Sequence, residues 1–175
     1  MSQSATLYRI SQDTFSQLEA SKEKGQFKPA AMAKGYSTFQ GSHMGLEFVL
    51  SKGQPKETTD LITQIFNPTK AIGMEGLNEE DVLALYEFDE IIYYLDSKTV
   101  SKINTFLKTL SVEDAIASYD SEELNRNGVY PELWRAGESR DEAYNQRDIA
   151  EGVKELKDIF EAADADHNSI LIFIG

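Results

Sequence analysis

A histidine and a carboxylate at helical spacing are the most reactive pairing in this sequence. His43 and Glu47 lie four residues apart in a segment whose apolar residues recur every three to four positions. On a helix, this spacing places the imidazole and the carboxylate on one face, within reach of each other. Such a pair can serve as a general base and its orienting group, although an ordinary surface or partly buried pair is more common. A small-ligand-binding protein or hydrolase would hold both residues in a cleft beside Tyr130.

A second group of residues could recognise a partner through aromatic surface. Tyr130, Pro131 and Trp134 follow one another closely, and rigid aromatic side chains lose little conformational entropy on binding. The competing interpretation is that Tyr130 and Trp134 pack over the core while Pro131 fixes a turn. We favour packing, because large aromatic side chains are highly buried on average.

Sequence patterns for metals and cofactors fail at decisive positions. The run Asp164–Asn168 resembles the start of a calcium loop, but Ser169 and Gly175 stand where glycine and a bidentate glutamate are needed. The glycines at 73 and 76 are not followed by the lysine of a phosphate-binding loop. With two histidines and no cysteine, a zinc site is not expected. We therefore predict no metal, no cofactor and no catalytic residue.

The distribution of charge is the strongest indication of a partner. The formal net charge is −13, and residues 75–123 contain 13 acidic residues against 3 basic ones, including Glu87, Asp89 and Glu90. This acidic segment would repel nucleic-acid phosphates and attract a basic protein. We predict a non-enzymatic interaction protein, for which an immunity protein that neutralises a basic toxin is one example. A solvated acidic surface that only maintains solubility is the alternative.

Length and composition set the class of protein. The chain has 175 residues, of which 41% are hydrophobic and 27% charged, as in an ordinary folded domain. No linker-like stretch divides it, so we expect one domain over residues 1–175. The absence of cysteine fits a reducing compartment. No signal peptide or membrane-spanning run is evident, and we expect a cytoplasmic protein that does not bind membranes.

Apolar periodicity predicts a mostly helical α+β domain around a small sheet. Five consecutive apolar residues, Ile170–Ile174, indicate a strand covered on both faces and central in that sheet. Ser139–Glu142 has the form of a capping box before a long C-terminal helix, in which Gly152 is a local weakness. Further strands are expected at 5–10 and 88–95; helices at 11–18, 42–51, 58–66, 97–110 and 112–119; and loops at 21–36 and 69–76.

The segment 120–131 interrupts the helical pattern most sharply. Asp120 ends one helix, Ser121 can cap a final turn, and Gly128 supplies a left-handed exit. Val129 and Tyr130 must then run extended, because the residue before a proline avoids helical geometry. The segment is predicted to be a structural corner.

Short motifs spread along the chain resemble the YfbM-like family of bacterial proteins, a domain of unknown function. The motifs are Leu7–Ile10, Gly45–Gly53, Tyr94–Asp96, Tyr119–Pro131 and Ile170–Gly175. Members of that family often have a Trp-His pair where this chain has His43 and Met44. The resemblance implies an α+β domain and brings no established reaction, cofactor or catalytic residue.

Overall fold

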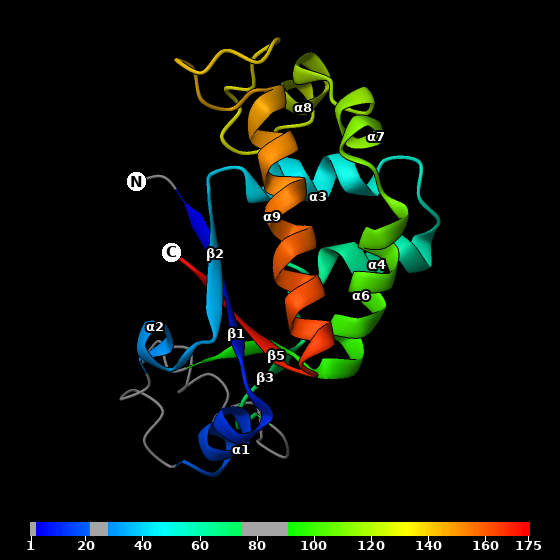
Figure 1. Cartoon of the computed structure of the whole chain (residues 1–175). Coiled ribbons are helices and arrows are strands. Elements are labelled where there is room, and N and C mark those ends of the chain that lie inside the picture. The colour runs from blue at the N-terminus through cyan, green and yellow to red at the C-terminus, as the bar shows by residue number, and fades with distance from the viewer. Residues whose placement is uncertain (1–2, 22–27, 75–90) are drawn as a thin grey trace.

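The structure, a computed structural model, describes residues 3–21, 28–74 and 91–175. Figure 1 shows a layer of helices packed against one face of a sheet, with two shorter helices near the opposite face. The predicted α+β class is confirmed. The strands of the sheet are β1 (Ser4–Ile10), β2 (Gly35–Gln40), β3 (Lys70–Ala71), β4 (Tyr93–Leu95) and β5 (Ser169–Ile174).

All neighbouring strands in this sheet are antiparallel, and their order is β2-β1-β5-β4-β3. The C-terminal strand β5 is therefore central, as its continuous apolar sequence predicts. Ile170 and Ile172 face one core cluster, whereas Leu171 faces the other. Burial of both faces explains why this strand lacks polar alternation.

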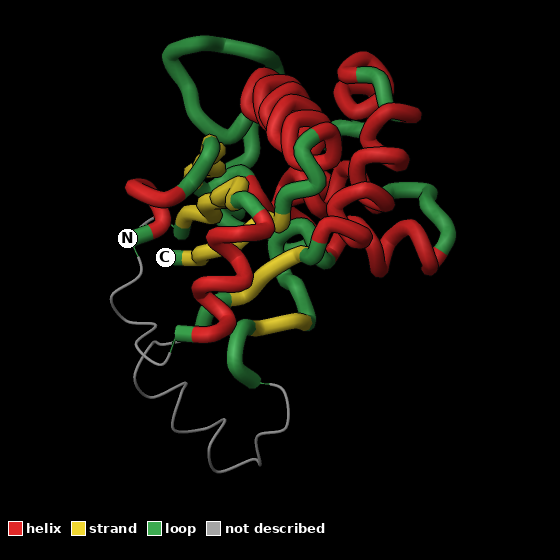
Figure 2. The backbone as a smooth tube through the Cα atoms, turned by 60° about the horizontal axis from the view of Figure 1, so that its bottom comes forward, coloured by secondary structure: helices red, strands yellow, loops and turns green. Residues whose placement is uncertain are grey.

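The sheet is supported by helices of very different length. The long helix α9 lies along the sheet between β2 and α6, as Figure 2 also shows from below. The described helices are α1 (Gln12–Ala20), α2 (Pro29–Met32), α3 (His43–Ser51), α4 (Lys56–Thr63), α6 (Ser97–Thr109), α7 (Val112–Ala117), α8 (Ser121–Arg126) and α9 (Gln146–Ala165).

Two hydrophobic clusters hold the sheet between these helices. The larger one joins the strand residues Ala5, Leu7 and Ile170 to buried side chains of α3, α6 and α9. The smaller one, on the other face, packs α1 through Phe15 and Leu18 against the sheet. The stripe predicted for α9 lies wholly in the larger cluster: Ile149, Val153, Leu156, Phe160 and Ala163.

The start of α9 differs from the sequence prediction. Asn145, not Ser139, is the N-cap, and Asp148 completes its capping box. Asn145 is fully buried and donates hydrogen bonds to the carbonyls of Ser139 and Glu142, both at 2.8 Å. The predicted capping box over 139–142 is therefore wrong, because the buried amide both caps the helix and closes the loop before it.

Gly152 is a contact point and not merely a weak position in α9. A Cβ built on Gly152 would lie 2.5 Å from Cδ1 of Leu46, so the glycine lets α9 approach α3 closely. A second close approach involves α3 itself, where a Cβ on Gly45 would lie 2.1 Å from Cη2 of Trp134. Helix α3 thus packs closely, through glycine contacts, against α9 and against Trp134 in the loop before α9.

Strand β2 was not predicted: its first two residues fall in the predicted loop 21–36, and the others received no assignment. It has one buried side chain, Phe39, and lies at the edge of the sheet, paired with β1 alone. An edge strand with one buried residue has no apolar alternation to reveal it. The pairing partner that makes it a strand is distant in sequence.

Candidate functional site

The surface of α3 that faces away from the core forms the floor of a groove of about 530 Å³. We call it the α3 groove. Its floor residues recur at three- and four-residue spacing, so they share one face of the helix. They are Met44, Glu47, Phe48, Ser51 and Lys52. One wall comes from α4 and the turn after it (Thr59, Thr63 and Asn67), and the other from the chain after α8 (Asn127, Gly128, Val129 and Tyr130).

Helix α3 presents this face because its opposite face is buried. Leu46, Val49 and Leu50 are at most 3% exposed and belong to the larger core cluster. Glu47 and Phe48 are half-buried, and Met44 is exposed. The groove therefore combines a carboxylate with apolar side chains on a rigid helical floor.

Glu47 supplies the carboxylate of the groove. Its Oε1 accepts a hydrogen bond from Oγ1 of Thr63 at 2.9 Å, and its Oε2 accepts one from Nδ2 of Asn67 at 3.2 Å. Burial raises the pKa of the Glu47 carboxyl above its usual range, and the two hydrogen bonds lower the pKa only in part. Both of its donors among the described residues are neutral, so the structure leaves the carboxylate without a cation.

Two polar groups extend the floor beyond Glu47. The hydroxyl of Ser51 is buried and has no hydrogen-bond partner in the described part of the chain. The ammonium of Lys52 forms an ion pair with Glu123 and lies 3.5 Å from the carbonyl oxygen of Ser118. The lysine charge is thus balanced at the α8 end of the groove, away from Glu47.

The second wall is fixed by contacts around Trp134. The indole Nε1 donates to the carbonyl of Val129 at 3.0 Å, and the Trp134 backbone makes two hydrogen bonds of 2.9 Å with the side chain of Asn125. Helix α8 itself begins with Asp120 as its N-cap and is followed by Gly128 at φ +66°. The left-handed exit at Gly128 matches the sequence prediction, whereas the cap is Asp120 and not Ser121.

Tyr130 and Trp134 have different surroundings. Trp134 is 3% exposed and packs on α3, so it has the packing role that we favoured over a recognition ledge. Tyr130 is half-buried and lines the groove, and its hydroxyl accepts a hydrogen bond from the backbone N–H of Gln3 at 3.1 Å. The structure therefore brings Tyr130 and Glu47 into one groove, although they are far apart in sequence.

His43 does not line the groove. It is the first residue of α3, is 3% exposed, and its ring lies 5.6 Å from the ring of Phe66. Burial lowers the pKa of the imidazole, and a hydrogen bond to the backbone of Phe39 opposes this shift. Its Nδ1 has no hydrogen-bond partner among the described residues, so the predicted pairing with Glu47 is not formed there.

Of the residues that line the groove, only Glu47 and Tyr130 were candidates from the sequence, and the polar residues around Glu47 were missed. Thr63 and Asn67 bind the Glu47 carboxylate from another element, and no sequence signal connects them to α3. Ser51 could have been found, because it lies one helical turn after Glu47 on the same face. The predicted acidic residues Glu87, Asp89 and Glu90 lie outside the described residues.

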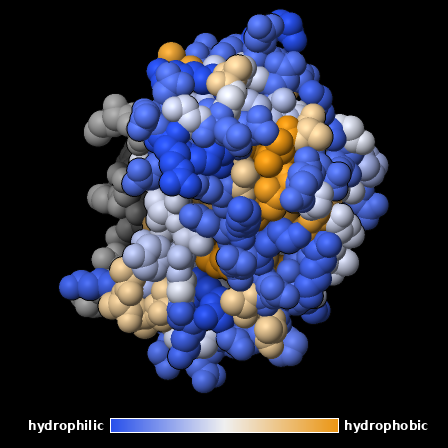
Figure 3. Space-filling view, turned by 45° about the horizontal axis from the view of Figure 1, so that its top comes forward, coloured by the Kyte–Doolittle hydropathy of each residue, from blue (hydrophilic) through white to orange (hydrophobic). Residues whose placement is uncertain are grey.

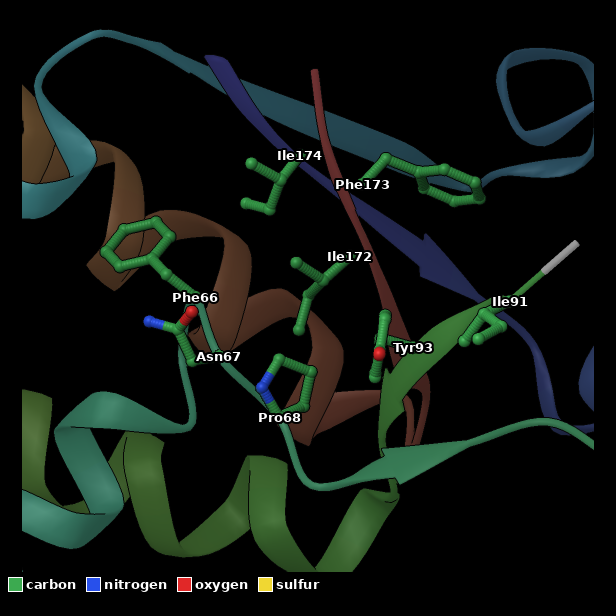
Figure 4. A pocket seen from close by; sticks show the side chains of 8 residues that line it. All are labelled: Phe66, Asn67, Pro68, Ile91, Tyr93, Ile172, Phe173 and Ile174. Atoms are coloured by element: carbon green, nitrogen blue, oxygen red, sulfur yellow. The ribbon is translucent and has the colours of Figure 1, made fainter. Parts of the chain in front are cut away.

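Another pocket, of about 510 Å³, lies where β5 extends past β4. Figure 4 shows that most of its lining side chains are apolar: Phe66, Pro68, Ile91, Tyr93, Ile172, Phe173 and Ile174, with Asn67. The described residues that line it include no charged side chain, and their polar groups are the amide of Asn67 and the hydroxyl of Tyr93. Figure 3 shows one face of the molecule, on which most surface residues are hydrophilic and a group of apolar side chains lies in a hollow between them.

The described residues contain neither a metal-binding cluster nor a membrane-spanning helix. Residues 3–21, 28–74 and 91–175 contain no group of three or more histidine, aspartate or glutamate side chains placed to hold a metal ion. Within the same ranges, no helix has the length and apolarity needed to cross a membrane.

Comparison with known proteins identifies relatives but no activity. The domain of unknown function DUF1877 matches residues 1–173. The structure is similar to the crystal structure of YfbM from Escherichia coli, a protein of unknown function, with a TM-score of 0.66 and 13% sequence identity over all of both chains. At that identity, the likeness shows a common fold. No curated protein matches the sequence.

Proposed function

Because the chain belongs to the family defined by the domain of unknown function DUF1877, as its YfbM-like motifs predict, its relatives supply no reaction. We propose from the geometry of the α3 groove that the protein is a non-enzymatic interaction module of the cytoplasm, which holds a basic side chain of a protein partner. An immunity protein bound to a basic toxin would be one such pair.

The carboxylate of Glu47 carries this proposal. Removing a charged group from water is unfavourable unless a cation or several donors compensate. Glu47 has two neutral donors and no cation among the described residues, and burial raises the pKa of its carboxyl in spite of these two hydrogen bonds. A cationic side chain in the groove would stabilise the ionised form, so binding energy is available there.

The charge of the whole chain supports the same partner. With a net charge of −13, the protein attracts basic proteins over distances limited by the Debye length. The acidic segment 75–123 contributes most of this charge and would increase the association rate. Glu47 and the apolar floor of the groove would then slow dissociation.

The alternative function has less support in the geometry. A hydrolase or small-ligand-binding protein of the predicted kind needs His43, Glu47 and Tyr130 in one cleft. The groove contains Glu47 and Tyr130, while the imidazole is packed against Phe66. We therefore place interaction ahead of catalysis.

Affinity capture with matched variants tests the proposal. The immobilised full-length protein would be compared with Glu47→Gln and with Glu161→Gln, an exposed residue of α9 outside the groove. Both changes remove one negative charge. We expect a basic protein to be retained at low salt by the wild type and by Glu161→Gln, and to be largely lost from Glu47→Gln.

Circular dichroism of each variant would show that the fold is kept. Equal retention of the same partner by Glu47→Gln and wild type would contradict the groove as the binding site. Failure of the wild type to retain any basic protein at low salt would contradict the interaction function itself.

A further inference from the structure

Building on the proposed function, we propose that the α3 groove is selective for arginine: it receives one arginine side chain from the surface of the protein partner, with the guanidinium bound by Glu47 and Ser51. The selectivity follows from the hydrogen-bonding capacity that the groove leaves unused. The alternative cation, a lysine ammonium, fits that capacity less well.

Both oxygens of Glu47 are left with acceptor capacity. A carboxylate offers about two lone-pair sites on each oxygen. Thr63 takes one site on Oε1 and Asn67 takes one on Oε2. The described residues therefore leave one acceptor site on each oxygen, and Glu47 lines the groove. Two acceptors side by side match the parallel N–H groups of a guanidinium.

A lysine ammonium would use this arrangement less completely. It is a compact point charge without a planar fork, and it is more strongly hydrated than a guanidinium. It would also lose more hydration on entering a half-buried groove. The arrangement of free acceptors at Glu47 thus favours arginine through both geometry and desolvation.

Ser51 supplies a third acceptor for the same ligand. Its buried hydroxyl has no hydrogen-bond partner within the described ranges, and a buried hydroxyl without a partner is unfavourable. Ser51 lies one turn after Glu47 on the groove face of α3. An arginine carries five N–H donors, so donors are left for this hydroxyl after two of them have bonded the carboxylate.

The remaining lining suits the rest of an arginine side chain. Met44 is 39% exposed and, with Phe48, gives an apolar surface for the methylene stem. The ring of Tyr130, in the facing wall, is of the type on which guanidinium groups stack. Lys52 does not oppose the ligand strongly, because its charge is paired with Glu123.

Titration with three short peptides tests the selectivity. The probes are acetyl-Gly-Xaa-Gly-amide with arginine, lysine or the neutral isostere citrulline as Xaa, added to the isotopically labelled full-length protein. Backbone amide shifts would be followed by NMR. We expect saturable shifts in α3 with the arginine peptide, about tenfold weaker binding of the lysine peptide, as for loss of one charge-assisted hydrogen bond, and no saturation with citrulline.

Variants separate the two acceptors. Glu47→Gln should abolish arginine binding, whereas Glu161→Gln should leave it unchanged. Ser51→Ala should weaken arginine binding about threefold to tenfold, the range for a neutral hydrogen bond. Because the Ser51 hydroxyl has no partner among the described residues of the unbound protein, its removal should not lower the melting temperature.

Each outcome decides a separate claim. Equal, Glu47-dependent binding of the arginine and lysine peptides would overturn the arginine selectivity and leave the basic-partner function standing. Saturable arginine binding with shifts outside α3, α4 and 127–130 would overturn the site. Absence of saturable binding by the arginine peptide would also overturn the inference, while capture of whole proteins would still test the proposed function independently.

Discussion

Replacing Gly45 by alanine tests the contact that positions the groove. Gly45 lies within α3, where helix propensity alone predicts that alanine is more stable by about 1 kcal/mol. The tertiary structure predicts the opposite. A Cβ at this position would lie 2.1 and 2.2 Å from Cη2 and Cζ2 of Trp134, and a buried indole ring cannot bend away as a flexible side chain can.

The loss of unfolding free energy in Gly45→Ala is the sum of an overpacking cost and a broken hydrogen bond of the indole ring. Overpacking of a filled core costs about 1–3 kcal/mol. Displacing the indole also breaks the bond from its Nε1 to the Val129 carbonyl, and an unsatisfied buried group costs about 1–3 kcal/mol. After subtracting the propensity gain, we expect a loss of about 3 kcal/mol, or a melting temperature lower by about 6–12 °C.

Urea denaturation followed by fluorescence measures this loss directly, because Trp134 is the single tryptophan of the chain. Trp134→Leu provides the control background, where the added methyl group meets a smaller and more flexible side chain. Because this background contains no tryptophan, unfolding is followed by circular dichroism in both backgrounds for this comparison. Gly45→Ala should cost clearly less there than in the wild type. An unfolding free energy for Gly45→Ala at or above the wild-type value, with unchanged tryptophan emission, would refute the reasoning.

Four further substitutions follow from buried groups. Gly152→Ala should be destabilising, contrary to its helix propensity, but by only about 1 kcal/mol, since its neighbour Leu46 is flexible; a gain in unfolding free energy would contradict this. Asn145→Ala removes the N-cap of α9 and two loop hydrogen bonds, and should lower the unfolding free energy by about 2–4 kcal/mol in urea titrations. An unchanged urea midpoint would argue against a stabilising role of Asn145. Burial raises the pKa of the Glu47 carboxyl in the folded state, so its contribution to stability is present below about pH 4.3 and lost as pH rises through the folded pKa. Glu47→Gln should therefore gain stability relative to wild type between pH 4 and pH 7. A difference in unfolding free energy between the two proteins that stays constant with pH would be inconsistent with the shift. Burial lowers the pKa of His43, so the imidazole binds a proton more readily in the unfolded chain than in the folded one, and stability falls as pH drops below about 6.5. This loss of stability should be smaller in His43→Gln. Identical profiles of stability against pH in the two proteins would exclude His43 as its source.

The elements with strong apolar periodicity could be read from the sequence. The stripe of α9 and the continuous apolar run of β5 each contain the information for their own burial, so their type and location are confirmed. Strand β2 could not be found in this way, because only Phe39 is buried and its backbone hydrogen bonds depend on β1. The first turn of α9 was misplaced because Asn145 becomes the N-cap through its hydrogen bonds to the preceding loop, and these bonds form only in the folded chain.

The groove shows the same division at the level of function. Glu47 and Tyr130 were both candidate residues, but their meeting depends on the wall after α8, which Trp134 fixes to Gly45. His43 and Glu47, only one turn apart, lie in different surroundings because Phe66 covers the first turn of α3. Sequence by itself determined the family, the α+β class and the main helices and strands, since apolar periodicity is a local property. Only the tertiary structure decided which polar groups meet, because burial and hydrogen bonding of a side chain depend on elements that are distant in sequence.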